Sequence, residues 1–246
     1  MDILGIITAR GGSKGIPQKN LRKIHKKPLI QYTLEVAKKS KINKLIVSTD
    51  DPKIIKLSKS LKIEVPFLRP KKISQDSTPT IDVIKHALNF LSNKNRYNPE
   101  IIVILQPTSP FRTVKMINDS INMLQRTNST SVIAVSRVTH HPFTMFYYNS
   151  KYLKPFSKKY TKYTRRQMYP VLYYPNGSIY TLWTKTLFKY DSIYGPRIKP
   201  IIINEKANID IDDNYDMFMS EMTMMHWKKY EKLFKDESNK LLKDNT

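Results

Sequence analysis

The chain has 246 residues and no cysteine, and its 43 lysines and arginines against 20 aspartates and glutamates give a formal net charge of +23. The absence of cysteine excludes disulfides, thiolate metal sites and cysteine nucleophiles. The positive charge predicts attraction to an anion, which could be nucleic acid, anionic lipid, a nucleotide or an acidic metabolite, and solvated surface lysines explain part of it equally well.

Short apolar runs alternate with amphipathic patterns over most of the chain. Strands are predicted at Ile3–Thr8, Lys44–Thr49, Glu100–Leu105, Ser131–Val135, Ser178–Trp183 and Lys199–Ile203. Helices are predicted at Leu29–Lys39, Pro52–Lys62, Thr80–Asn93 and Val114–Arg126. Prolines after Asp51 and Thr78 are typical of helix starts. This alternation predicts a single α/β domain over residues 1–246, with a Rossmann-like, mainly parallel sheet and helices on both faces.

The loop between the first predicted strand and the first helix concentrates glycine and cations. The stretch ARGGSKGIPQKN, residues 9–20, holds three of the six glycines together with Arg10, Lys14 and Lys19, and no acid. Such loops bind phosphate in α/β folds, because glycine lets backbone N–H groups approach an anion closely. The loop matches neither the P-loop pattern nor the dinucleotide pattern G-x-G-x-x-G. Its greater length and the positions of its cations favour a triphosphate lying across the loop over a pyrophosphate on a helix tip. The density of glycine, the cations and the place of the loop after a strand favour phosphate binding over an ordinary turn with solvated lysines.

A group of neutral polar residues follows the predicted strand Glu100–Leu105. Ligands of open α/β sheets bind outside the carboxyl ends of the strands. The segment LQPTSPFR places Gln106, Thr108 and Ser109 there, with Arg112 behind them. Ser109 is equally suited to cap the helix that follows, so ligand contact and capping both remain open at this stage.

After Val138 the alternation of strands and helices breaks. Between His140 and Tyr174 the chain has no clear period, and it carries eleven aromatic residues and seven cations. We expect an insertion, residues 139–175, that projects from the sheet. Aromatic and basic side chains in this number suit either a surface for single-stranded nucleic acid or a dimer interface. The tail from Trp227 has a charged helical pattern.

Asp210 and Asp212 are separated by one residue in the stretch NIDID. In an extended strand, residues two positions apart point to the same face, about 6.6–6.8 Å apart along the chain. Two carboxylates placed in this way suit one Mg²⁺ and leave positions for phosphate oxygens and water. The alternative is an exposed strand edge or a helix N-cap, with Asp212 or Asp213 as the capping residue.

Taken in order, these motifs resemble those of the CMP-sialic acid synthetases, the acylneuraminate cytidylyltransferases. The similar segments are ARGGSKGIPQKN, LIVSTDD at 45–51, LRPKKISQDSTPTIDVI at 68–84, LQPTSPFR at 105–112, RRQ at 165–167, NGSIY at 176–180 and IDID at 209–212. The resemblance implies a nucleotide-diphospho-sugar transferase-like fold. It also implies a Mg²⁺-dependent enzyme that joins CMP from CTP to a nine-carbon α-keto acid sugar for cell-surface glycan synthesis and releases pyrophosphate.

The resemblance assigns roles to individual residues. The catalytic residues would be Arg10, Lys19, Asp210 and Asp212, with the two aspartates as metal ligands. The nucleotide would contact Ala9, Arg10, Gly11, Gly12, Ser13, Lys14, Asn20 and Arg69. The sugar would contact Gln106, Thr108, Ser109, Arg165 or Arg166, and Asn176. Arg69 is explained as well by a solvated loop cation, and Asn176 by an Asn-Gly turn.

The resemblance also implies that residues 139–175 form a dimerisation arm exchanged between subunits, with Arg165 or Arg166 entering the partner's site. We therefore expect a homodimer that binds CTP and an acidic nine-carbon sugar, and neither nucleic acid nor a membrane. In HHPFTMF, Phe143 and Thr144 stand where many family members carry a lysine. This departure leaves sialic, legionaminic, pseudaminic and deoxy-octulosonic acid open as substrates.

Two further expectations concern the setting of the protein. No stretch approaches the ~20 apolar residues of a membrane span, and the short N-terminal apolar run does not fit a secretory signal. A cytoplasmic enzyme is therefore expected. The main alternative is a basic, aromatic nucleic-acid-binding protein, but it leaves the glycine loop and the two aspartates unexplained.

Overall fold

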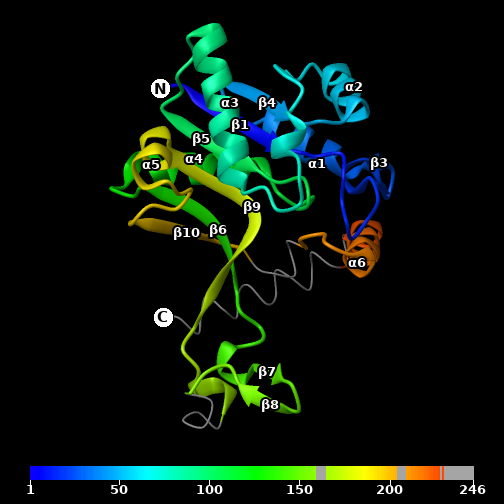
Figure 1. The fold of residues 1–246 in the computed structure, drawn as a ribbon, viewed down its shortest axis with the longest axis vertical. Helices are drawn as coiled ribbons and strands as arrows, with labels where there is room; N and C mark the ends of the chain where they lie inside the picture. The colour runs from blue at the N-terminus through cyan, green and yellow to red at the C-terminus, as the bar shows by residue number, and fades with distance from the viewer. Residues whose placement is uncertain (159–164, 204–208, 228, 230–246) are drawn as a thin grey trace.

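The structure, a computed structural model, describes residues 1–158, 165–203, 209–227 and 229 (Figure 1). Its centre is a six-stranded sheet in the order β10-β6-β9-β5-β1-β4. The strands are β1 (Ile3–Thr8), β4 (Lys44–Ser48), β5 (Ile101–Leu105), β6 (Ser131–Arg137), β9 (Tyr173–Trp183) and β10 (Ile198–Ile202). Only β9 runs antiparallel to its neighbours, while the other pairs in this sheet are parallel. The predicted mainly parallel sheet is confirmed.

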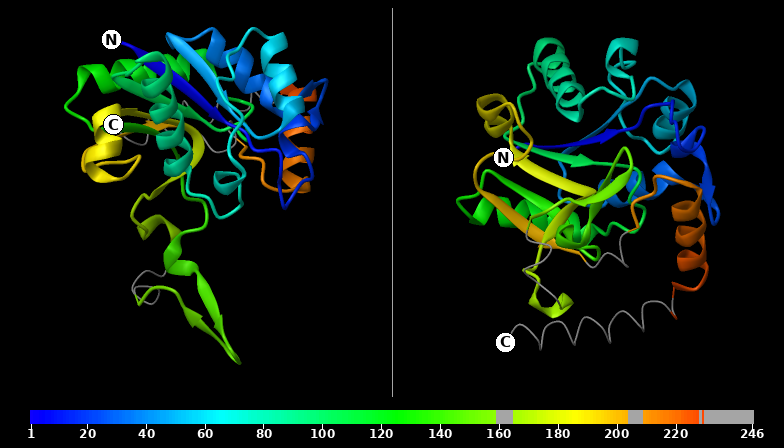
Figure 2. Two further views of the ribbon diagram at one scale, coloured as in Figure 1. Left: turned by 45° about the horizontal axis from the view of Figure 1, so that its top comes forward. Right: turned by 60° about the horizontal axis from the view of Figure 1, so that its bottom comes forward.

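Side chains of the central strands alternate between two hydrophobic layers. On one face, Ile3 and Ile7 of β1 pack with α1 (Leu29–Lys38), α2 (Pro52–Ser60) and α4 (Val114–Arg126). On the other face, Leu4 and Ile6 pack with α3 (Thr80–Asn95) and α5 (Thr184–Tyr190). Helices therefore cover both faces, as the views in Figures 1 and 2 show and as the sequence predicted.

Polar residues set the starts of two of these helices. Asp51 caps α2 by accepting a hydrogen bond of 2.7 Å from the Lys53 N–H, with Pro52 in the first turn. Thr113 caps α4 by accepting a hydrogen bond of 3.2 Å from the Met116 N–H. The suggestion that Ser109 caps α4 is therefore wrong, because the helix begins only after Thr113, four residues further along the chain.

A smaller unit lies at the edge of the sheet beside α1. It contains a short 3₁₀ turn, η1 (Lys19–Leu21), the two-stranded ribbon of β2 (Lys23–Ile24) and β3 (Lys27–Pro28), and α6 (Asn214–Met225). Buried residues from the glycine loop, the ribbon, the start of α1, the aspartate segment and α6 share one small core: Ile16, Ile24, Leu29, Ile211 and Met217. This unit holds the two distant halves of the candidate site together.

The segment between β6 and β9 projects away from the sheet and ends in a hairpin of β7 (Phe146–Asn149) and β8 (Tyr152–Pro155) (Figure 1). Two 3₁₀ turns flank the hairpin, η3 (Pro142–Thr144) and η4 (Arg166–Met168). Strand β9 begins at Tyr173, earlier than the predicted Ser178, and pairs with β6 up to Arg137.

The predicted helical tail lies outside the described residues apart from its first positions. None of the helices in the described part of the chain is long and apolar enough to cross a membrane.

Candidate active site

A cleft of about 350 Å³ opens at the carboxyl ends of β1 and β5. Its wall is formed by the glycine loop, the segment from Arg69 to Val83, the residues after β5, and the aspartate segment. Of the predicted site residues, those that line it are Arg10, Gly12, Ser13, Lys19, Asn20, Arg69, Gln106, Thr108, Asp210 and Asp212. Segments far apart in the sequence thus meet where ligands bind in open α/β sheets.

The glycine loop is held in shape by hydrogen bonds to its neighbours. The Gly11 N–H donates to Oδ1 of Asp50 at 2.8 Å. The side-chain amide of Asn20 donates to the carbonyl oxygen of Arg10 at 2.9 Å. Because the Gly11 N–H is satisfied within the chain, the cations of the loop are better placed than this N–H to receive an anion.

The far end of the loop packs against the aspartate segment. Nζ of Lys19 donates to the carbonyl oxygen of Ile211 at 2.7 Å and to Oδ1 of Asp212 at 3.1 Å. Gly15 lies so close that a Cβ atom built on it would be 2.6 Å from the carbonyl oxygen of Asp212. Only glycine allows this approach, so the position of Gly15 fixes the distance between the loop and the aspartates.

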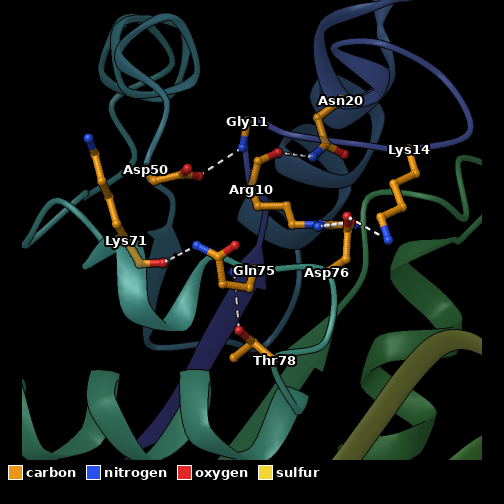
Figure 3. A network of polar contacts seen from close by, with 9 residues as sticks. All are labelled: Arg10, Gly11, Lys14, Asn20, Asp50, Lys71, Gln75, Asp76 and Thr78. Atoms are coloured by element: carbon orange, nitrogen blue, oxygen red, sulfur yellow. Dashed lines mark hydrogen bonds and ion pairs between the residues drawn. The ribbon is translucent and has the colours of Figure 1, made fainter.

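Two loop cations meet a carboxylate across the cleft (Figure 3). Arg10 forms an ion pair with Asp76, and Nζ of Lys14 lies 3.6 Å from the other oxygen of the same carboxylate. The side chain of Lys14 is mostly exposed, whereas those of Arg10 and Asp76 are about one third exposed. The positive charge of the loop is therefore partly neutralised within the chain.

Arg69 is a buried cation on the wall of the cleft. Its side chain donates to the hydroxyl and the carbonyl oxygen of Ser48, and the residue is 4% exposed. Burial lowers the pKa of Arg69 to about 10, while the charge of Asp50 opposes the shift. Arg69 thus stays positively charged at neutral pH, and the alternative of a solvated loop cation is wrong.

The aspartate segment is not the predicted extended strand, but Asp210 and Asp212 do point to the same side, as expected. Residues 209–212 form no β-strand; they lead into α6, with the Ile211 N–H bonded to the carbonyl oxygen of Thr108 at 2.9 Å. Ile211 is buried in the small core, while Asp210 and Asp212 both line the cleft. The N-cap of α6 is Asp213, which forms a capping box with Asp216, so Asp212 is free of that role.

The environment of Asp210 suits a cation. Its Oδ1 atom is buried, and none of the residues that the structure describes gives it a hydrogen bond. Burial raises the pKa of Asp210, and the charge of Asp212 adds to this effect, whereas a hydrogen bond from Thr108 and the charges of Lys19 and Arg112 oppose it. An orphaned buried carboxylate oxygen beside a second carboxylate is a donor set that fits Mg²⁺.

Asp210 and Asp212 form a set of two carboxylates, while Asp76, which also lines the cleft, pairs with Arg10. Within the described ranges, no group of three or more His, Asp or Glu residues is placed to hold a metal ion. Mg²⁺ commonly binds proteins through one or two carboxylates and completes its shell with water and substrate phosphates. A two-carboxylate set is therefore consistent with a nucleotide-bound Mg²⁺.

Gln106 and Asp210 converge above Gly177. A Cβ atom at Gly177, where φ is +75°, would lie 2.7 Å from Oε1 of Gln106 and 3.0 Å from Oδ2 of Asp210. Arg112 fixes the backbone below, because its buried guanidinium donates to the carbonyl oxygens of Gln106 and Ser178, both at 2.6 Å. Burial lowers the pKa of Arg112 to about 9, with the charge of Asp210 opposing the shift.

Several predicted residues do not line the cleft, namely Ala9, Gly11, Lys14, Ser109, Asn176 and Arg165. The amide of Asn176 is used internally, since it donates to Oγ of Ser136 at 3.0 Å and accepts from Oγ of Ser178 at 2.8 Å. Ser109 is buried, and its hydroxyl has no hydrogen-bond partner within the described part of the chain. Arg165 is exposed on the projecting segment, and Arg166 begins η4.

The sequence predicted no role for the other residues that line the cleft: Thr8, Ile73, Gln75, Asp76, Thr78, Thr80, Val83 and Pro107. Thr8 ends β1, and Thr80 begins α3. Both lie where the cleft opens, so their position at the end of a strand and the start of a helix could have identified them as candidate lining residues.

Comparison with known proteins places the chain in a family. A family model described as cytidylyltransferase matches residues 4–244. The N-acylneuraminate cytidylyltransferase of Escherichia coli O18:K1:H7 is 31% identical over 94% of this chain, which spans only 54% of that relative's length. The CMP-N,N'-diacetyllegionaminic acid synthase of Legionella pneumophila is also 31% identical, over 91% of this chain and 97% of the relative.

A solved structure supports the same fold. The structure of a CMP:2-keto-3-deoxy-manno-octonic acid synthetase complexed with CTP superposes with a TM-score of 0.68, covering 92% of this chain and 99% of that one at 17% identity. The family model extends over almost the whole chain, and both the glycine loop and the aspartate segment fall within the matched range. This chain therefore belongs to the cytidylyltransferase family of nucleotidyltransferases.

Proposed function

We propose that this protein transfers CMP from CTP to a sialic-type nonulosonic acid and releases pyrophosphate. The observation that carries the proposal is that Arg10 and Lys19 of the glycine loop share one cleft with Asp210 and Asp212. A cleft with phosphate-binding cations on one side and two carboxylates on the other suits transfer from a nucleoside triphosphate. The names of the two relatives, at 31% identity, support the choice of sugar class.

The cations of the loop would bind the triphosphate. Arg10, Lys14 and Lys19 come from one loop and reach anions from different points, with Lys19 nearest the aspartates. The charge that develops on the attacked phosphate and on the leaving pyrophosphate would be stabilised by Lys19 and Arg10. Asn20 and Arg69, on the same wall, would contact the cytidine.

Asp210 and Asp212 would hold Mg²⁺, whose charge, when the ion is bound, would favour attack on the α-phosphorus. Lys19 would keep Asp212 in place through their contact of 3.1 Å. Gln106 and Thr108 would orient the sugar beside this pair, because both lie on the cleft wall and Gln106 meets Asp210 above Gly177. Positioning of the sugar hydroxyl against the phosphate supplies much of the rate in such transfers.

We further propose that residues 139–175 form a dimerisation arm. Support comes from the hairpin, where large apolar side chains are exposed: Phe146, Tyr147, Tyr148, Tyr152, Leu153 and Phe156. Aromatic residues in such patches are typical of protein interfaces. In the dimer, Arg165 or Arg166 would enter the partner's site and meet the carboxylate of the sugar. Because CTP is a cytoplasmic metabolite, the proposal places the reaction in the cytoplasm.

The function is tested by measuring pyrophosphate release from CTP with sialic, legionaminic, pseudaminic and deoxy-octulosonic acids, with UTP and ATP as alternative nucleotides. We expect turnover with CTP and at least one nonulosonic acid. No turnover with any of these acids, together with salt-sensitive binding of oligonucleotides, would support the nucleic-acid-binding alternative instead.

The assignment of the metal ligands is tested with Asp212→Asn. We expect this variant to lose Mg²⁺-dependent turnover by about 100-fold or more while it stays folded. Asp213→Asn is the matched control, because asparagine is as good an N-cap as aspartate and the cap of α6 is preserved. Equal activity of the two variants would contradict the assignment.

A further inference from the structure

The cations on which we place the triphosphate already have an anionic partner within the chain. Arg10 pairs with one oxygen of Asp76, and Lys14 lies 3.6 Å from the other (Figure 3). Asp76 also lines the cleft. A single carboxylate therefore neutralises two of the three loop cations, at the point where phosphate oxygens would bind.

A preformed turn presents Asp76 to these cations. The Thr78 N–H donates to the carbonyl oxygen of Gln75 at 3.2 Å, and the Gln75 N–H donates to Oγ1 of Thr78 at 3.1 Å. The side-chain amide of Gln75 also donates to the carbonyl oxygen of Lys71 at 2.8 Å. These bonds do not use the carboxylate of Asp76, so the turn holds its shape when this side chain is changed.

Two other acids at the loop have structural tasks that distinguish them from Asp76. Asp50 accepts the Gly11 N–H and helps to fix the loop. Asp212 receives Lys19 at the junction with the aspartate segment. Asp76 instead faces two side-chain cations on flexible stems, from a turn that is itself largely exposed. A carboxylate in this position competes with an incoming anion for the same donors.

We propose that Asp76 is a built-in competitor of the phosphate chain: it sets how tightly the site holds the β- and γ-phosphates and re-forms its pair with Arg10 and Lys14 as pyrophosphate leaves. The inference rests on the proposed function in placing the triphosphate on the loop cations. Its consequence is weaker retention of pyrophosphate than the cations alone would give, and hence less product inhibition.

The test is binding of inorganic pyrophosphate to the full chain by titration calorimetry, with EDTA present so that only the protein's own cations respond. Asp76→Asn should bind pyrophosphate about three- to tenfold more tightly than the natural protein, the range expected when a partly exposed ion pair no longer competes. Asp76→Glu keeps the charge and should stay close to the natural affinity. Pyrophosphate should also become a stronger product inhibitor of Asp76→Asn.

Asp82→Asn is the matched control. It makes the same change in net charge in the exposed first turn of α3, and Asp82 does not line the cleft. Its affinity for pyrophosphate should change by less than about twofold, since an exposed charge that does not line the cleft is screened by salt. An equal increase in the affinity of Asp82→Asn for pyrophosphate would overturn the proposal, because the change in net charge alone would then explain the effect of Asp76→Asn.

Unchanged or weaker pyrophosphate binding by Asp76→Asn, with an unchanged melting temperature, would also overturn the proposal. If the asparagine variant is unstable, Asp76→Ser removes the same charge and is measured in its place. Absence of any pyrophosphate binding in both the natural protein and Asp76→Asn would overturn it as well. Failure of the proposed function has a different signature: no sugar acid is turned over, while the affinity for pyrophosphate still responds to Asp76.

Discussion

Gly15 is the residue at which the glycine loop touches the aspartate segment. A Cβ atom there would lie 2.6 Å from the carbonyl oxygen of Asp212, a backbone atom that cannot rotate away. We predict that Gly15→Ala forces the loop and the aspartates apart. The free energy of unfolding should fall by about 1–3 kcal/mol, as in other overpacked sites. Turnover should fall about tenfold or more, because catalysis depends on the positions of groups to within ~1 Å.

Gly12→Ala is the comparison for stability. Apart from the two chain neighbours of Gly12, no described residue has an atom within 4 Å of a Cβ built there, so the substitution introduces no clash. Thermal unfolding should show a lower melting temperature for Gly15→Ala and little change for Gly12→Ala. Identical melting temperatures would mean that the contact between Gly15 and Asp212 is easily relaxed.

Single residues of the site were predictable where their chemistry is local. Arg10 precedes the first glycine of the loop and Lys19 follows the last, and Asp210 and Asp212 lie on either side of one apolar residue. These local patterns indicated a phosphate loop and a pair of carboxylates, and all four residues line the cleft. Asn176 shows the limit of this reasoning. An amide beside glycine suits a ligand contact, but its partners Ser136 and Ser178 became visible only once the strands were paired.

At the scale of elements, the N-terminal cap of α6 fixes the backbone directly after Asp210 and Asp212. Asp213 accepts the Asp216 N–H at 2.9 Å, and the Asp216 side chain accepts the N–H groups of Asp212 and Asp213. We predict that Asp213→Ala lowers the free energy of unfolding by about 1 kcal/mol, whereas Asp213→Asn is close to neutral, as for other N-cap substitutions. Urea unfolding curves of the two variants check this, and a neutral Asp213→Ala would contradict the role of the cap.

The six strands of the sheet and α1 to α4 were predictable because their local signals agree with the tertiary structure, whereas the seven-residue α5 was not predicted. β1 and β5 are short runs of buried apolar residues, and α2 begins at an aspartate followed by proline. The small elements were not found. β2 and β3 have two residues each, and α6 has a weak apolar periodicity because its buried residues, Met217, Ser220 and Thr223, are mixed in polarity.

At the scale of the whole molecule, the sequence located the insertion but not its form. The break in periodicity after Val138 coincides with the end of β6 at Arg137. The hairpin carries no two-residue turn of the Asn-Gly or Asp-Gly type between alternating strands, the strongest local signal for such a structure. The residues of β7 and β8 are exposed on both faces, so no alternation of buried and exposed side chains marks these strands.

The exposed hairpin gives the last prediction, which concerns assembly. Tyr148 and Leu153 face each other across β7 and β8 and are 72% and 66% exposed, so a partner surface must cover them if the arm dimerises. We predict a homodimer by light scattering and a monomer for Tyr148→Lys combined with Leu153→Glu, because charges in the core of an interface oppose association. Opposite charges at a cross-strand pair preserve the hairpin itself. Phe188→Glu, which places a charge on an exposed aromatic residue of α5, should remain a dimer. If the natural protein is monomeric at micromolar concentration, the arm has another role, and if the double variant remains dimeric, the interface lies elsewhere.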